Sequence, residues 1–454
     1  LDESVIIKKY RWNVLPNYDK DYIFDYFGIT TFIKVYGLKV EDKIVELPSE
    51  MFFRVALYLA DTKEEFEEYY EGLCSQKISL ATPILLNAGT KNSSMISCAL
   101  LSLKDDSLEG IDDTFHNINK LSKDAAGIGL WIGNLRSNQS RVGGRGKAGG
   151  VVRFAKMLDE HMKFFNQRGS RPGSAALYLD VWHRQIEDFL ELRLPEGDEG
   201  LRARDLFLSV VINDFFYKKC QLDEDWYLFD PNDIKSLGLN PLYELLGEEF
   251  EENYNHLVNL AKENKISFKK VKAIDILHKI THSQIKTGLP YVFNKENANR
   301  GYNQSNWGVC KSSNLCIEYI GYSDKDNEAQ CCLGAVVLPK HINKRGIQYD
   351  KIIESSGLLC DILNKVIDKN KWSTPEAKET GLSQRTIGVG LAGLADVYAI
   401  LDLPFISEKS KEINKKIMES IYYGTILKSC ELASKTKIKK TNSKINDTLL
   451  AKGK

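Results

Sequence analysis

The sequence has no net charge, no apolar run long enough to span a membrane and no CxxC motif. Across 454 residues, lysine plus arginine and aspartate plus glutamate each number 62, so no overall field attracts nucleic acid or an anionic membrane. A membrane helix needs roughly 20 consecutive apolar residues, and none occurs. Nine cysteines at irregular spacing argue against a secreted disulfide framework. These absences predict a soluble chain in the cytoplasm that binds neither membrane nor nucleic acid.

The apolar pattern predicts an α/β architecture that follows a helical start. Apolar residues recur at helical spacing over 50–59 and 61–73, and short apolar stretches alternate with longer amphipathic ones from residue 96. Strands are expected at 96–103, 175–180, 206–212, 290–293 and 331–338. Helices are expected at 111–126, 151–165, 248–264, 272–286, 350–368 and 410–434, and Gly-rich loops at 133–150 and 166–174.

The most informative motif is Asn314-Leu-Cys316-Ile-Glu318. In an extended segment, residues i, i+2 and i+4 project to one side, so an amide, a thiol and a carboxylate would face one small substrate. This set suits radical chemistry on a polyol, because a thiyl can take a hydrogen atom, a carboxylate a proton, and an amide can hold a hydroxyl. Taken alone, a buried cysteine between two solvated polar residues explains the motif better.

Four longer segments give this motif a context, and they span much of the chain. They are Ile96–Gly110 around Cys98, Arg202–Phe207, Lys311–Glu318 and Thr386–Asp396. Together they closely resemble the large, catalytic subunit of class I ribonucleotide reductases, from about Tyr22 to the C-terminus. The resemblance implies a ten-stranded α/β barrel, only part of it present, with a central finger loop near 310–320. A partial helical domain over 1–90 would precede the barrel, which would occupy 91–454.

The resemblance implies a role for each residue of the redox chemistry. Cys316 would carry a thiyl radical that takes the ribose 3′ hydrogen, Glu318 would act as general base on the 3′-hydroxyl, and Asn314 would hydrogen-bond that hydroxyl. Cys98 and Cys331 would deliver two electrons and close a disulfide. Ser97 and Arg171 would contact the substrate.

The adjacent cysteines Cys331 and Cys332 need to be distinguished. Neighbouring strand residues face opposite sides, so only one of the two can face Cys98. The family's spacing from the radical cysteine favours Cys331. Cys332 is then expected to be a packed thiol on the outer face.

A second group of residues resembles the family's specificity site, where a dNTP or ATP effector selects the substrate base. The group is Asp106, Ser107, Lys123 and Arg136. By this resemblance Asp106 would bind the effector's sugar, and Lys123 and Arg136 would lie near its phosphates. The simpler interpretation is an Asp-Ser N-cap with solvated cations around it.

The resemblance also implies the cofactors and partners. This chain would bind no cofactor of its own, because a metal-containing small subunit generates the radical. The other partners implied are a ribonucleoside diphosphate substrate, a second copy of the chain and a thioredoxin or glutaredoxin.

The family's later elements are a phosphate loop, a tyrosine pair and a C-terminal cysteine pair, and none is found before Lys454. The chain is therefore expected to be incomplete at both ends, or to be completed by a second chain.

Several alternatives remain open. Gly388-x-Gly390-x-x-Gly393 matches a dinucleotide-binding fingerprint, but only a short run over 385–389 precedes it, so the glycines fit a tight strand-to-helix turn better. His278 and His282 would share a helix face, yet a third zinc ligand is missing. An adenosylcobalamin-dependent reductase and a non-catalytic, nucleotide-binding regulatory protein on the same fold also fit the sequence.

Overall fold

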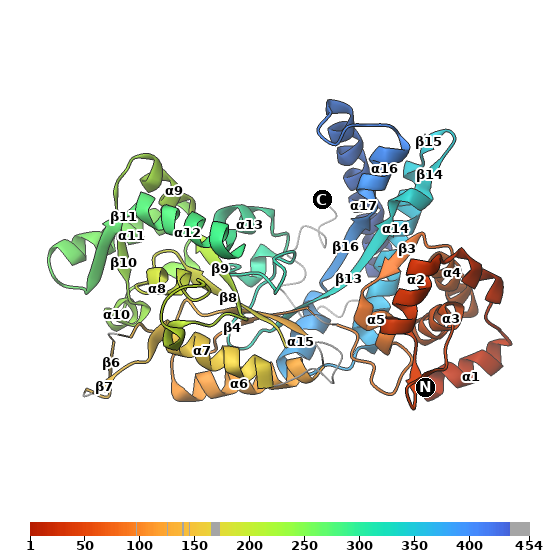
Figure 1. Ribbon diagram of the computed structural model, residues 1–454, viewed down its shortest axis with the longest axis horizontal. Coiled ribbons are helices and arrows are strands. Elements are labelled where there is room, and N and C mark those ends of the chain that lie inside the picture. Colours follow the sequence, from red (N-terminus) through yellow and green to blue (C-terminus); the bar gives the residue numbers. More distant parts are fainter. Residues whose placement is uncertain (97, 125, 139, 145, 165–172, 436–454) are drawn as a thin grey trace. The chain divides into compact units, whose positions relative to one another are not determined.

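The computed structural model of the chain describes residues 1–96, 98–124, 126–138, 140–144, 146–164 and 173–435. Most of the predicted Gly-rich loop 166–174 lies outside these residues. The chain divides into two compact units (Figure 1). Unit 1 comprises Leu1–Ser97, Cys331–Trp372 and the chain from Gly381 onward. Unit 2 comprises Cys98–Gln330 and Ser373–Thr380.

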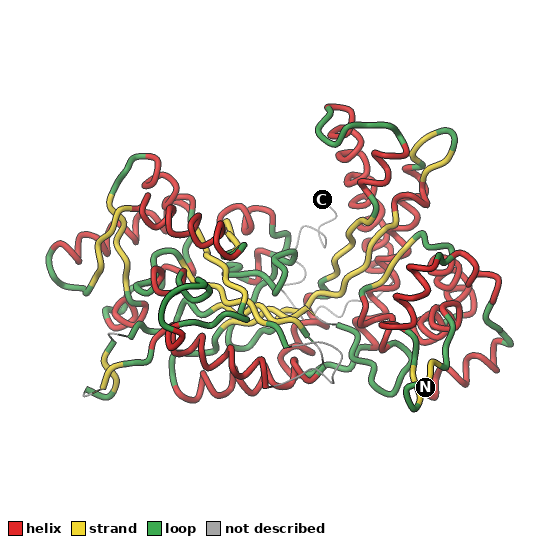
Figure 2. Tube along the Cα trace, in the orientation of Figure 1, coloured by secondary structure: helices red, strands yellow, loops and turns green. Residues whose placement is uncertain are grey.

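Unit 2 is built on a parallel sheet in which the strands follow the order β12-β9-β8-β5-β4. Its strands are β4 (Cys98–Ser102), β5 (Gly127–Trp131), β8 (Ala175–Asp180), β9 (Phe207–Ile212) and β12 (Tyr291–Asn294). Every residue of β8 is buried, as expected for a central parallel strand with both sheet faces covered. Figure 2 shows these strands in yellow, separated along the chain by helices.

Helices pack on one face of this sheet and form the larger apolar core of unit 2. The helices of the unit are α6 (Leu108–Lys123), α7 (Gly150–Phe164), α8 (Ile186–Leu190), α9 (Asp214–Gln221), α10 (Pro231–Ser236), α11 (Gly247–Lys262), α12 (Ala273–Thr287) and α13 (Lys295–Gly301), with single turns η3 (Glu199–Leu201), η4 (Leu242–Glu244) and η5 (Ser305–Trp307). Ile118 of α6 and Leu158 of α7 pack in this core with Ile128 and Leu130 of β5. Burial of apolar side chains on this face anchors the sheet.

The opposite face of the sheet carries a smaller core, and two peripheral two-stranded sheets complete the unit. The smaller core contains Trp131, Ala176, Tyr178, Val211, Phe293 and Ala298. The first of these sheets is the hairpin β6–β7 (Arg141–Val142 with Gly146–Lys147), and the second is the antiparallel pair β10–β11 (Asp225–Phe229 with Phe268–Lys272), whose strands are separated along the chain by α10, η4 and α11. The hairpin lies within the predicted Gly-rich loop 133–150.

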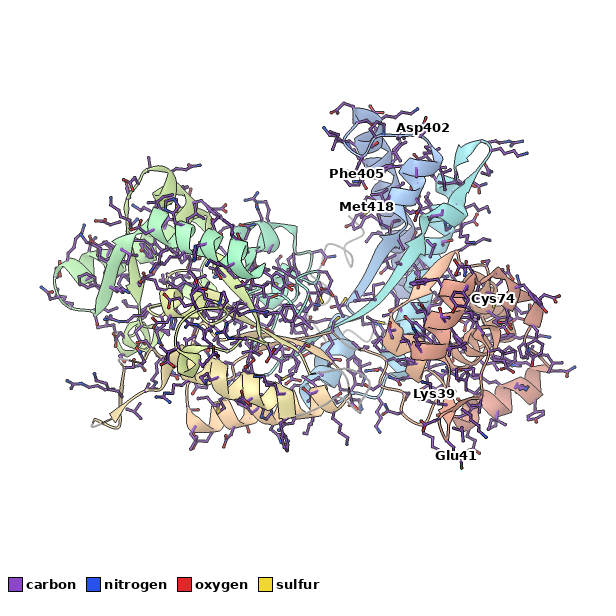
Figure 3. All side chains as sticks on the ribbon, viewed as in Figure 1. Lys39, Glu41, Cys74, Asp402, Phe405 and Met418 are labelled. Carbon is purple, nitrogen blue, oxygen red and sulfur yellow. The ribbon has the colours of Figure 1, made fainter. Side chains whose placement is uncertain are left out.

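Unit 1 is mainly helical. Its helices are α1 (Glu3–Trp12), α2 (Tyr26–Thr31), α3 (Pro48–Leu59), α4 (Lys63–Cys74), α5 (Thr82–Asn87), α14 (Tyr349–Lys369), α16 (Leu394–Ile400) and α17 (Glu408–Lys435), with η1 (Tyr18–Ile23), η2 (Phe32–Tyr36) and η6 (Leu338–His341); α15 (Pro375–Gln384) crosses the unit boundary. Pro48 starts α3, and the Leu47 N–H donates to Glu50 Oε2 at 2.9 Å, a favourable N-terminus. Cys74 ends α4 and is buried among these helices (Figure 3).

A short sheet places β13 (Ala329–Val337), which belongs to unit 1 from Cys331 onward, between β3 (Ile78–Leu80) and β16 (Ile387–Ala392). The small hairpins β1–β2 (Lys39–Val40 with Lys43–Ile44) and β14–β15 (Ile342–Asn343 with Gly346–Ile347) lie outside it. Gly388 and Gly390 are inside β16, so the predicted strand-to-helix turn at these two positions is wrong. The turn is made by Gly393, which has φ +81° and precedes α16.

The predicted α/β class is confirmed, and the predicted strands and helices all occur with shifts of a few residues at their ends. Among the described residues, no helix has the length and apolarity to cross a membrane. His278 and His282 are exposed on α12. The part of the chain that the structure describes contains no group of three His, Cys, Asp or Glu side chains placed to hold a metal ion.

Candidate active site

A loop between α13 and β13 crosses the smaller core of unit 2, and we call residues 308–328 the finger loop. Its entry is held by Asn299, which accepts from the Cys310 N–H at 2.8 Å and donates to the Cys310 carbonyl at 2.9 Å. Its exit is held by Ser102 of β4, whose hydroxyl lies 2.9 Å from that of Ser323. Between them, Ser313 and Ile320 form an antiparallel bridge. The loop is therefore a narrow finger with both legs attached to unit 2.

Two glycines of β5 make room for the finger loop. A Cβ atom on Gly129 would lie 2.1 Å from the Ser313 carbonyl oxygen, and one on Gly127 would lie 2.7 Å from Leu315 Cδ2. Glycine inside a strand often marks such a close approach of another backbone. Strand β5 was not predicted from the sequence, although a Gly-x-Gly pair inside an apolar run was the available signal.

The motif Asn314–Glu318 forms a tight turn, so the extended conformation predicted for it is wrong. Ile317 has φ +61°, an unusual left-handed conformation for a β-branched residue. The Asn314 side chain accepts from the Tyr319 N–H at 3.2 Å, and the Tyr178 hydroxyl donates to the Asn314 carbonyl at 2.5 Å. Leu315 and Ile317 pack on the smaller core. A side-chain-capped turn thus replaces the alternation of a strand.

Three of the predicted catalytic groups lie together because of this turn, and not because of an extended segment. Asn314 Nδ2 donates to Glu318 Oε1 at 2.7 Å. The Cys98 thiol, at the start of β4, donates to the same carboxylate oxygen across 3.6 Å. Cys316 lies at the exposed tip of the turn. An amide, a carboxylate and two thiol positions are therefore gathered on one side of unit 2.

The electrostatics of this group favour a neutral Cys98. Burial raises the pKa of the Cys98 thiol to about 12, and the charge of Glu318 adds to that shift. Thiols react as thiolates, so Cys98 is held in its protonated form at neutral pH. A protonated thiol beside a carboxylate can supply a hydrogen or a proton to a substrate bound over the turn.

Two tyrosines near the turn were not predicted. Tyr178 on β8 is fully buried, and burial raises its pKa, so it stays a donor to the Asn314 carbonyl. Tyr291 on β12 is half-buried and stacks on Phe207 with ring centroids 6.2 Å apart. Burial and, secondarily, the neighbouring Cys316 raise the pKa of Tyr291. Neither tyrosine belongs to a short motif, so only the sheet brings them to the turn.

Cys331 is placed by β13 in unit 1, and its neighbour Cys332 points the other way. Cys332 is 1% exposed and packs in the apolar core of unit 1, as predicted for a packed thiol. Cys331 is 4% exposed, and a Cβ atom on Gly388 of β16 would lie 3.3 Å from its Sγ. Gly388 therefore leaves space beside Cys331 rather than forming a turn.

The predicted effector-binding residues are only partly gathered. Arg136 Nε lies 2.5 Å from Asp106 Oδ2, and Arg136 also donates to the Asp106 carbonyl at 3.1 Å. Burial raises the pKa of the Asp106 carboxyl against the opposing influence of this guanidinium. The Ser107 hydroxyl accepts from the Gly110 N–H at 3.0 Å and caps α6.

Lys123 lies at the other end of the same helix. It is the last residue of the 16-residue helix α6 that Ser107 caps, which puts about 24 Å between the two at about 1.5 Å per residue. Within one chain, Lys123 is therefore out of reach of a nucleotide held by Asp106. Ser97 and Arg171, the predicted substrate contacts, lie outside the described residues.

Two known protein domains match this chain. The domain described as "Ribonucleotide reductase, barrel domain" matches residues 96–453, and "Ribonucleotide reductase, all-alpha domain" matches residues 22–93. These matches confirm the predicted fold class, a helical N-terminal region before an α/β barrel.

Curated relatives agree with the domain matches. The ribonucleoside-diphosphate reductase large chain 2 of Saccharomyces cerevisiae is 37% identical over 427 residues, which is 92% of this chain and 48% of the relative. The large subunit of Plasmodium falciparum is 37% identical over 95% of this chain and 53% of its own length. The Vaccinia virus large subunit is 38% identical over 95% of this chain and 55% of its own length. The chain thus spans about half the length of the relatives it matches.

Proposed function

Because this chain belongs to the ribonucleotide reductase large-subunit family, we propose that it supplies the catalytic site of a ribonucleoside-diphosphate reductase. The observation that carries the proposal is the contact of Glu318 with both Asn314, at 2.7 Å, and Cys98, at 3.6 Å, on the turn that bears Cys316. These are the groups that reduction of a ribose needs in one place. The product would be a 2′-deoxyribonucleotide for DNA synthesis.

In the proposed reaction, a thiyl radical on Cys316 takes the 3′ hydrogen of the ribose. Glu318 takes the 3′-hydroxyl proton while Asn314 holds that oxygen, and the 2′-hydroxyl leaves as water. Cys98 and Cys331 supply two electrons and protons, and their sulfurs are oxidised to a disulfide. The 3′ hydrogen then returns from Cys316, which regenerates the radical. The net change is one C–O bond replaced by C–H, two thiols oxidised and one water released.

Ser97 and Arg171 are proposed as further substrate contacts.

The proposed reaction needs partners. A metal-containing small subunit would generate the radical, and a thioredoxin or glutaredoxin would reduce the disulfide. Such a thiol cycle suits a reducing compartment, and we place the protein in the cytoplasm.

We also propose allosteric control by a dNTP or ATP at Asp106, Ser107 and Arg136. The N-terminus of α6, capped by Ser107, and the guanidinium of Arg136 suit phosphates. Since α6 separates Lys123 from this end, Lys123 would serve a nucleotide bound by another copy in a homodimer.

The direct test is ribonucleotide reduction by the complete enzyme with Cys316 replaced. Cys316→Ser removes the radical carrier, so CDP reduction in the presence of the small subunit and a dithiol is expected to fall to background. Cys220→Ser is the matched control, because Cys220 is a buried thiol of α9 on the helical face of unit 2. Reduction that persists in Cys316→Ser would refute the proposal.

The same assay discriminates the alternatives. Turnover that depends on added adenosylcobalamin and not on the small subunit would identify a cobalamin-dependent reductase. Nucleotide binding without turnover in any combination would identify a regulatory protein.

A further inference from the structure

Lys311 is a buried lysine at the entry leg of the finger loop. Its side chain is 5% exposed, and its Nζ donates to Glu244 Oε1 at 2.8 Å, while the Glu244 side chain is 39% exposed. Burying an ammonium group is energetically costly unless nearby groups compensate its charge. The partly hydrated carboxylate of Glu244 does not compensate this charge by itself. Other groups around Lys311 must therefore contribute.

Three aromatic rings contribute to that compensation, and the buried carboxyl of Asp180 lies close enough to interact with the charge of Lys311. The Lys311 Nζ lies 5.1 Å from the ring centroid of Trp131, 5.8 Å from that of Tyr243 and 5.9 Å from that of Tyr322. All three distances are within the ~6 Å reach of a cation–π interaction. The rings come from strand β5, from η4 and from the exit leg of the finger loop. One ammonium group thus contacts three separate parts of unit 2.

The ring of Trp131 is itself fixed. Its Nε1 donates to the buried Asp180 Oδ2 at 2.8 Å, and it packs edge-on against Tyr243 at 4.8 Å between centroids. Trp131 and Tyr243 therefore hold Lys311 from outside the finger loop, whereas Tyr322 belongs to the loop itself. Lys311 and Tyr322 bracket the whole turn from Asn314 to Glu318.

We propose that Lys311 is a positioning residue that holds Glu318 and Cys316 in place relative to Cys98. The inference rests on the proposed function, because it assigns to Lys311 the placement of groups that would carry that reaction. Asn314 follows Lys311 by three residues, so a shift of the entry leg moves the turn directly. Displacements of about 1 Å at reacting groups can cost on the order of 100-fold in rate.

The test compares two lysines that each pair with a glutamate and lie over an aromatic ring. Lys311→Met keeps the volume but removes the charge, and water can solvate the half-exposed Glu244 that remains. Lys219→Met is the matched control, since Lys219 pairs with Glu224 and lies 4.9 Å over the ring of Phe215 on α9. Both variants are made in the full protein, and iodoacetamide labelling of Cys98 is followed by mass spectrometry as a function of pH.

Lys311→Met is expected to move Glu318 away from Cys98 and to lower the pH at which Cys98 becomes reactive. Labelling at pH 9 should then rise about tenfold for each unit by which the pKa falls, while Lys219→Met leaves the profile unchanged. Lys311→Arg should restore much of the original profile, because guanidinium keeps the charge and stacks on rings. An unchanged Cys98 profile in folded Lys311→Met, or the same change in Lys219→Met, would overturn the proposal.

Turnover gives an independent readout. Lys311→Met should lower kcat about tenfold or more and change KM by less than about twofold, as expected when placement rather than binding is lost. If Lys311→Met does not fold, Glu244→Gln at the half-exposed partner should shift the Cys98 profile in the same direction, and no shift would count against the proposal. If the wild-type enzyme reduces no ribonucleotide, the proposed function fails, whereas the labelling comparison still judges the role of Lys311.

Discussion

Two groups of polar residues in unit 2 are assembled in opposite ways. In the finger loop, Asn314 and Glu318 contact each other because the chain turns between them. At the start of α6, Asp106 instead pairs with Arg136, which is 30 residues away, while Lys123 is carried to the far end of the helix. A turn brings sequence neighbours together, whereas a helix separates them by about 1.5 Å per residue.

The two carboxylates also differ in what surrounds them. Asp106 is paired with a guanidinium, an arrangement that holds a fixed ion pair beside a helix N-terminus. Glu318 contacts an amide and a thiol, which hydrogen-bond it without neutralising its charge. The first arrangement suits binding of a charged ligand, and the second leaves a carboxylate able to accept a proton.

The largest expected effect comes from removing Glu318, the proposed proton acceptor of the turn. Glu318→Gln keeps the hydrogen-bond geometry but cannot act as a base, so kcat should fall about 10²–10⁴-fold. The measurement is single-turnover reduction of CDP with nucleotide binding checked separately. If Glu318→Gln still turned over, Glu318 would not be the base, and it would no longer differ from Asp106 in that role.

The next effect tests whether the finger loop depends on close backbone contact. Gly129→Ala places a methyl 2.1 Å from the Ser313 carbonyl oxygen, so we expect a loss of about 3 kcal/mol in unfolding free energy, and a large drop in turnover. Gly301→Ala is the control, because a Cβ there meets no atom within 4 Å. Urea unfolding of both variants measures the difference. Equal stabilities would show that the loop does not lie tightly on β5.

The ion pair at α6 should have a smaller, specific effect. Arg136→Ala removes a guanidinium that would hydrogen-bond the phosphates of the proposed effector, so effector affinity should fall about tenfold. Calorimetry measures this affinity. Lys235→Ala is the control, since its ion pair with Asp105 is exposed at 76% and 55%. A comparable loss of affinity in both variants would argue for a diffuse charge effect rather than a site.

The pH dependence of Cys98 separates the two causes of its raised pKa. Burial and Glu318 both disfavour the thiolate and raise the pKa to about 12 from 9. Glu318→Gln removes only the second and smaller cause, so Cys98 labelling at pH 9 should rise several-fold, about tenfold for one unit. Slower labelling in this variant would mean that Glu318 stabilises the thiolate, contrary to the effect expected of a neighbouring negative charge.

The smallest expected effect is at Lys123. In a dilute, monomeric sample, Lys123→Ala should change effector affinity by less than about twofold, because α6 keeps it about 24 Å from Ser107. At concentrations that favour a dimer, the same variant should weaken binding. Sedimentation with and without effector provides the measurement. A strong effect in the monomer would contradict the separation set by the helix.

Much of the fold was predictable, and the failures have physical causes. Strand 175–180 was predicted with its observed bounds, because a continuous apolar run is typical of a buried parallel strand. Strand β5 was missed because Gly127 and Gly129 lower the strand tendency that an isolated pattern shows. Those glycines are explained only by the loop that crosses them. The turn at Asn314 was predicted as extended because its capping partners, including Tyr178, lie far away in sequence.

By itself, the sequence determined the chemical groups of the site and their family. An amide, a thiol and a carboxylate within five residues keep their identity whatever backbone carries them. Only the tertiary structure decided how these groups meet. Cys98 contacts Glu318, which is 220 residues away in sequence. The turn at Asn314 is held by Tyr178 and packs against two glycines, and Lys311 lies near three aromatic rings. Such contacts depend on which strands become neighbours, and that is settled by burial over the whole sheet rather than by any local pattern.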